Sequence, residues 1–269
     1  MTMKECLRVK RQVWRATLLL AGAAVLTPVR GTAAADSDAW CVAAARYESG
    51  ADETPLRQFE QALTASRGKP ERRAELEAAL IRLLAPETTF EAKRFACVQL
   101  AAFGTEAALP ALGELLKREE TAGIACLALG RLGGERAGAL LRAALETATG
   151  SGRVQYVVAM GRRAEPAAVP QLARLARDPD AAVANAAVRA LGATEGQEAS
   201  LALAALRAEA PVATADALAE STLRVAERLA ANGERREAAA LCDGLLATAR
   251  PRQLRRGAFD LLLRCQRDG

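Results

Sequence analysis

The feature that most limits the possible folds of this sequence is a pattern of residues that repeats about every 30 positions. Its turn positions, Gly104, Gly133, Ala164 and Glu195, are separated by 29, 31 and 31 residues. Large apolar residues recur four positions before each turn and eight positions after it. They are Leu100, Leu129, Met160 and Leu191 before the turns, and Leu112, Leu141, Leu172 and Leu203 after them. Columns of this kind predict stacked helical hairpins that bury their apolar faces against one another.

Two further columns hold mostly smaller residues, which suits close helix packing. Pro110 and Pro170 recur six positions after their turns, where a proline fits the first turn of a second helix. We therefore expect an all-α chain in which the leucine columns meet in one continuous core. The smaller columns lie seven and eight positions before the turns: Cys97, Cys126, Val157 and Val188, and Ala96, Ala125, Tyr156 and Ala187.

Three segments carry a resemblance to a known family. The stretches FEAKRFACVQLAAFGTEAALPAL, CLALGRLGGERAGALL and VAMGRRAEPAAVPQL resemble the short HEAT-like repeats of bacterial proteins. The resemblance covers residues 70–207 and implies a right-handed α-α solenoid of helical hairpins. It also implies a binding scaffold, since the family serves mostly in that role.

The repeat divides the chain into parts. We expect an irregular segment at 36–53, a degenerate first hairpin at 54–85, four HEAT-like repeats at 86–210 and C-terminal helices at 211–269. Counting from Gly233 places Leu229 and Leu241 in the two leucine columns, so a fifth unit is predicted there. The sequence of this unit, LAANGERREAAALCDGLL, also resembles a tetratricopeptide hairpin, and both interpretations stay open. The last helix lacks a partner helix, which suggests either a binding surface or a piece of a longer repeat protein.

Residues 1–35 are typical of a secretory signal peptide. Five basic residues precede an apolar core at 16–26, which is shorter than the roughly 20 residues that a membrane-spanning helix needs. Small residues then lead to a predicted cleavage site between Ala35 and Asp36. We expect export to the periplasm or outside the cell, with no membrane anchor once the signal is removed.

The charge balance changes when this segment is set aside. The full chain has 37 basic and 32 acidic residues. Residues 1–35 hold six of the basic and one of the acidic residues, which leaves 31 of each. A nucleic-acid-binding domain is expected to carry a basic surface, so this balance argues against a nucleic-acid partner.

The chain contains no histidine. Ser-His-Asp and Cys-His catalysis are therefore excluded, and so is the commonest metal ligand. HEAT-repeat hydroxylases of the deoxyhypusine type hold iron with His-Glu pairs, which this chain lacks. Bilin lyases with HEAT-like repeats remain a minor alternative. We expect no cofactor, no metal and no catalytic residues.

Cysteines are the other candidates for chemistry. Removal of the signal leaves five, and an odd number leaves at least one unpaired. Cys97 and Cys126 share a column with valines and are predicted to be buried thiols, because stacked helices lie about 8–10 Å apart and a disulfide needs Cα atoms within about 7 Å. Whether Cys242 and Cys265 pair is left open, and Cys41 has no evident partner.

A binding surface remains as the expected functional site. Basic residues on or after the predicted second helices form a candidate ridge for an acidic peptide: Lys117, Arg142, Arg174 and Arg177. Solvated surface charges with helix-spaced partners are the alternative. We predict a non-catalytic, exported scaffold with an unidentified protein partner and an oligomeric state that the sequence leaves open. The leading alternative is an accessory or fragment of a larger exported enzyme or redox assembly whose chemistry lies elsewhere.

Overall fold

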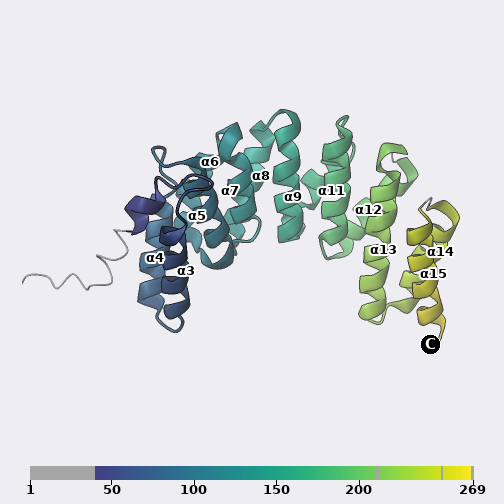
Figure 1. Cartoon of the computed structure of the whole chain (residues 1–269). Helices are drawn as coiled ribbons and strands as arrows, with labels where there is room; N and C mark the ends of the chain where they lie inside the picture. Colours follow the sequence, from purple (N-terminus) through teal and green to yellow (C-terminus); the bar gives the residue numbers. More distant parts are fainter. Residues whose placement is uncertain (1–39, 210–211, 250, 268–269) are drawn as a thin grey trace, which may run out of the picture.

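The computed structural model describes residues 40–209, 212–249 and 251–267, and every regular element within them is a helix. The helices stand side by side in an elongated row of two layers (Figure 1). The first layer consists of α5 (Phe90–Phe103), α7 (Glu119–Leu129), α9 (Arg153–Arg163), α11 (Ala181–Ala193) and α13 (Ala215–Ala231). The second layer consists of α6 (Leu109–Leu116), α8 (Glu135–Thr147), α10 (Val169–Leu175), α12 (Gln197–Glu209) and α14 (Arg235–Thr248).

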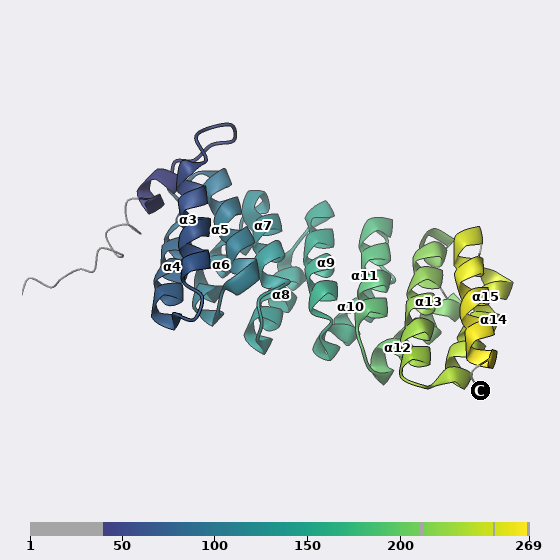
Figure 2. The same cartoon turned by 60° about the horizontal axis from the view of Figure 1, so that its bottom comes forward.

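The remaining helices lie at the two ends of the row. Helices α3 (Thr54–Ala65) and α4 (Pro70–Arg82) stand at one end, and α15 (Arg252–Arg267) stands at the other (Figure 2). Short 3-10 turns join several pairs: η1 (Glu106–Ala108), η2 (Gly150–Gly152), η3 (Pro166–Ala168) and η4 (Val212–Thr214). Each first-layer helix from α5 to α13 packs against the next one in its layer, so contacts run between neighbouring helices. The predicted all-α class is confirmed.

Local sequence signals explain where the helices begin and end. Thr89 caps α5 by accepting a hydrogen bond from the Ala92 N–H at 3.2 Å, and Asp180 caps α11 by accepting one from the Ala182 N–H at 2.8 Å. Prolines occupy the first turns of α3, α4, α6 and α10, where no intrahelical acceptor is lost. Gly233 ends α13 with a φ of +90°, a left-handed conformation that glycine adopts without a Cβ clash.

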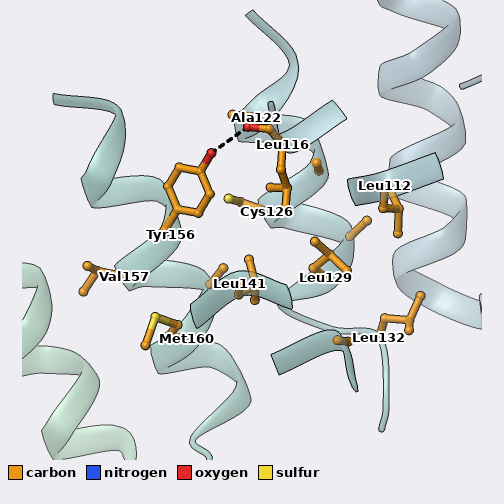
Figure 3. Close-up of a cluster of buried hydrophobic side chains, with 14 of the residues drawn as sticks. Leu112, Leu116, Ala122, Cys126, Leu129, Leu132, Leu141, Tyr156, Val157 and Met160 are labelled. Atoms are coloured by element: carbon orange, nitrogen blue, oxygen red, sulfur yellow. Dashed lines mark hydrogen bonds between the residues drawn. The ribbon is translucent and has the colours of Figure 1, made fainter. Parts of the chain in front are cut away.

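The core follows the columns that the repeat predicts. Every residue of the four columns that lie four, seven and eight positions before the turns and eight positions after them is buried in one hydrophobic cluster. Figure 3 shows part of it, where Leu112 from one unit and Leu129 and Leu141 from the next lie among their neighbours. The predicted meeting of the leucine columns in one continuous core is confirmed.

A fifth column explains how closely the first-layer helices approach. Three positions before the turns lie Gly130, Gly161 and Gly192. A Cβ added to Gly161 would lie 2.8 Å from the Ala190 Cβ, and one added to Gly192 would lie 2.6 Å from the Ser221 Cβ. Neighbouring first-layer helices therefore touch through glycine, and any larger side chain would push them apart.

Polar side chains also reach from one unit to backbone carbonyls of earlier units. The Tyr156 hydroxyl donates to the Leu116 carbonyl at 2.9 Å (Figure 3). The Arg163 guanidinium donates to the carbonyls of Leu129 at 2.7 Å and Gly134 at 2.6 Å, where α7 has ended. The bonds to Leu116 and Leu129 satisfy carbonyl groups at the ends of α6 and α7 that have no partner within their own helix.

The two ends of the row depart from the expected pattern. Residues 40–44, in the segment predicted to be irregular, are helical, because Trp40 packs on Phe59 with ring centroids 4.9 Å apart. In the fifth unit Leu229 and Leu241 are only partly buried, and Cys242 and Leu245 fill the core instead. Helix α14 therefore turns a different side inward than the count from Gly233 predicts.

Candidate functional site

The four basic residues of the predicted ridge all lie on or directly after second-layer helices, and each has a carboxylate beside it. Lys117 pairs with Glu114 at 2.6 Å and Arg142 with Glu165 at 3.0 Å. Arg174 pairs with Glu146 at 2.7 Å, and Arg177 pairs with Glu209 at 2.9 Å. The ridge therefore carries alternating charges.

Three of these pairs join successive parts of the row. Glu146 lies on α8 and Arg174 on α10, while Arg177 follows α10 and Glu209 ends α12. A residue about one repeat period away in the sequence thus becomes a neighbour in space. The repeat period is the sequence signal that points to these acidic partners, because Glu146 and Arg174 are 28 residues apart and Arg177 and Glu209 are 32 residues apart. The ridge as a site for an acidic peptide stays a prediction.

A second candidate surface lies on the first layer. A shallow groove of about 780 Å³ crosses α9, α11 and α13. Its apolar lining includes Val154, Val158, Ala186, Ala190 and Ala193. Val158 is 41% exposed although it is a large apolar residue. No motif of polar residues marks this surface in the sequence, because it is built from small residues that helices of every kind contain.

The groove exists because the helices that form it are lined with small side chains. Gly161 lies at its floor, where α9 meets the Cα of Ala190 on α11. The side chains of the alanines at 182, 186, 190 and 193 on α11 are short, whereas longer side chains such as Arg162 and Arg224 border them. The result is a channel with an apolar floor that stays open to solvent.

Three arginines and Asp216 are the charged residues that line this groove. Arg189 on α11 lies 3.2 Å from the Glu220 carboxylate on α13, and Arg224 lies 3.9 Å from the same group. Arg162 on α9 is exposed and makes no ion pair with any residue that the structure describes. The rim therefore offers one cation that is available to a carboxylate in a bound chain.

The cysteines are placed for packing. All five described cysteines are free and buried. Burial raises the pKa of the Cys97 and Cys126 thiols to about 12, so both are protonated at neutral pH. Burial, with a smaller contribution from Cys265, raises the pKa of Cys242 to about 11. The predicted buried thiols at 97 and 126 are confirmed.

The remaining predictions concern the signal peptide, a membrane anchor and a metal site. The signal peptide and the cleavage site at Ala35 and Asp36 lie outside the described residues. None of the helices that the structure describes is long and apolar enough to cross a lipid bilayer. In residues 40–209, 212–249 and 251–267, no cluster of three or more His, Cys, Asp or Glu side chains is placed to hold a metal ion.

Comparisons with known proteins add no assignment. No model of a known protein family matches the chain. A comparison with curated protein sequences likewise finds no match. The site must therefore be interpreted from its own geometry, which combines an apolar groove with an arginine rim on an extended helical row.

Proposed function

We propose that this chain is a non-catalytic scaffold that binds a protein partner outside the cytoplasm. In this proposal the helical row is a right-handed solenoid of HEAT-like hairpins, and the sequence motifs that resemble HEAT repeats support it. The signal-like residues 1–35 support export to the periplasm or beyond the cell. The partner is bound by surface contacts, without cofactor or metal.

The groove across α9, α11 and α13 carries the proposal. Its apolar lining includes Val158, which is 41% exposed, and exposed apolar surface with a polar border is typical of protein interaction sites. Arg162 and Arg189 on the rim fit a bound segment that has apolar side chains and a carboxylate. The alternating charges of the ridge at Lys117, Arg142, Arg174 and Arg177 make it the weaker candidate.

Site-specific crosslinking in the exporting cell tests the groove. A photo-crosslinking residue at Val158 is expected to capture a defined protein, while the same residue at Leu201, which is 60% exposed on α12, is expected to capture none. Arg162→Glu is expected to weaken the Val158 crosslink. Equal capture at both positions, or capture unaffected by Arg162→Glu, would show that the groove is not the binding surface.

A second experiment tests export and the scaffold role. The amino terminus of the protein recovered from an envelope fraction is expected to be Asp36. Purification from that fraction is expected to recover a fixed partner, and a catalytic partner would favour the larger-assembly alternative. An absorbance spectrum with a chromophore would instead favour a bilin-related enzyme and would contradict the proposed role.

A further inference from the structure

The outward face of α15 carries a second surface of a different chemical kind. Its buried side, with Ala258, Leu261 and Cys265, packs against α13 and α14. The opposite side holds Phe259 and Leu263, one helical turn apart, which are 49% and 41% exposed. Arginines continue the same strip toward both ends of the helix. The strip consists of Arg252, Arg256, Phe259, Leu263 and Arg267, spaced three and four residues apart.

The charge of this face is strongly one-sided. Helix α15 carries five arginines, at 252, 255, 256, 264 and 267, against one acidic residue, Asp260. Arg264 donates to the Asp260 carbonyl at 3.4 Å. The side chains of the other four arginines make no hydrogen bond or ion pair with any residue in the part of the chain that the structure describes. This contrasts with the ridge cations, each of which has a carboxylate beside it.

The position of three of these arginines is unfavourable for the isolated helix. Arg252, Arg255 and Arg256 lie in the first five residues of α15, and no acidic residue lies in its first turn. The amino-terminal end of a helix carries partial positive charge, so cations there are repelled and anions are attracted. An acidic ligand at this end of the helix would offset that repulsion.

We infer that this strip of α15 docks an acidic helical segment of a partner protein. Large aliphatic side chains one helical turn apart on that segment would cover Phe259 and Leu263. Carboxylates on either side of them would face Arg252, Arg256 and Arg267. An apolar centre surrounded by charged side chains is the usual arrangement of a protein-protein contact.

Two other occupants fit the charges less well. A second copy that docked through the same face would bring arginines against arginines across the two-fold axis. A lipid surface would need a wide apolar face that enters the interface, and the wide apolar face of α15 is already packed on α13 and α14. Only two large apolar side chains remain on the outward strip.

Selection from a displayed library of random helical peptides tests the inference with the full chain as target. The recovered peptides are expected to be acidic and to place apolar residues four positions apart. Their affinity is expected to fall at least about tenfold for Phe259→Asp and for the double variant Arg252→Glu/Arg256→Glu. Circular dichroism checks that both variants stay folded, and the double variant leaves the apolar pair untouched.

Matched controls lie on the first layer. The side chain of Val98 is 42% exposed, which is similar to the 41% of Leu263. Arg131 is exposed and makes no ion pair with any described residue. Val98→Asp and Arg131→Glu are expected to leave peptide affinity unchanged. Arg162→Glu in the groove is also expected to leave it unchanged, which separates this surface from the one in the proposed function.

Three results would overturn the inference. The first is a set of peptides with no excess of acidic residues, or peptides that bind the α15 variants as well as the parent protein. The second is sedimentation with phosphatidylglycerol-phosphatidylcholine vesicles that Phe259→Asp abolishes, which would assign the strip to a membrane. The third is self-association that the same variant abolishes, which would assign it to a second copy.

Discussion

At the scale of single residues, the polar side chains that matter most for this fold are those that enter the core with a partner. Tyr156 occupies a position where the other units have alanine, and it is buried because its hydroxyl reaches the Leu116 carbonyl. Glu77 is buried as well and accepts a hydrogen bond from the Thr105 N–H at 2.6 Å. In both cases one residue links two units of the row.

Removal of the Tyr156 hydroxyl tests this link. Tyr156→Phe keeps the ring and leaves the buried Leu116 carbonyl without its donor, so we expect a loss of about 1–2 kcal/mol in the free energy of unfolding. Urea unfolding followed by circular dichroism measures it. Tyr47→Phe, at a partly exposed position, is the control and is expected to change stability little. An equal effect of the two changes would mean that the buried hydrogen bond adds nothing.

Asp178 predicts a pH dependence. The Arg153 guanidinium, which donates to both Asp178 carboxylate oxygens at 3.2 and 2.6 Å, holds the pKa of Asp178 below its usual value of 3.8. Between the lowered pKa and 3.8, the unfolded chain binds the proton and the folded chain does not, so stability rises with pH. This contribution is present above pH 3.8 and is lost as the pH falls through the folded-state pKa.

The corresponding variant is Asp178→Asn. We expect it to be less stable than the parent at pH 6 to 7 by about 1–2 kcal/mol, with the difference shrinking as the pH falls below the usual Asp value of about 4. Urea unfolding at a series of pH values measures both curves. A difference that stays constant down to the lowest pH would show that the Arg153 ion pair is not its source.

At the scale of elements, the spacing of the first-layer helices depends on the glycine column. A helix with glycine at an interior position is normally less stable, by about 1 kcal/mol, than the same helix with alanine there. At position 161 we expect the opposite, with glycine giving the more stable protein, because the methyl group of an alanine would lie 3.0 Å from the Cα of Ala190 in the next helix. The backbone cannot move away there without separating two units.

Gly161→Ala is therefore expected to lower the free energy of unfolding by about 1–3 kcal/mol through overpacking. Gly133→Ala is the matched control, since a Cβ at Gly133 would meet no atom within 4 Å and its φ is not positive. Gly133→Ala is expected to be neutral or slightly stabilising. Thermal unfolding of the two variants in parallel measures the contrast, and a stabilising Gly161→Ala would refute the role given to the column.

At the scale of the whole molecule, the row has two cores. The main cluster runs from Trp40 to Val225, and a smaller one joins α13, α14 and α15 through residues such as Ala238, Cys242 and Leu261. In a linear array each unit is stabilised mainly by its neighbours. The two ends are thus expected to open independently of one another.

Leu261→Ala tests this division. The change removes a side chain that is 3% exposed and is expected to destabilise α14 and α15 by about 2–5 kcal/mol. Hydrogen exchange is expected to speed up in those helices and to stay unchanged in α5, α7 and α9. A uniform increase along the whole row would show instead that the chain unfolds as one cooperative unit.

Much of the fold was predictable because its information is local. The period of about 30 residues placed the helices and their turns, and it assigned Leu112, Leu141, Leu172 and Leu203 to the core correctly. Leu229 on α13 and Leu241 on α14 pack against the core but are only partly buried. The period did not predict the helix at residues 40–44, which depends on the distant Phe59. Packing between elements decided both cases.

The sequence by itself determined which residues of each hairpin are buried, since that depends on spacing within a helix and on the common period. Only the tertiary structure decided which charges meet and where the surface is hollow. The partners of Arg174 and Arg177, the groove beside Val158 and the unpaired arginines of α15 all depend on how far one unit is shifted and turned relative to the next. That offset follows from contacts between units, such as the close approach of Gly161 to Ala190, and the sequence of a single unit does not determine it.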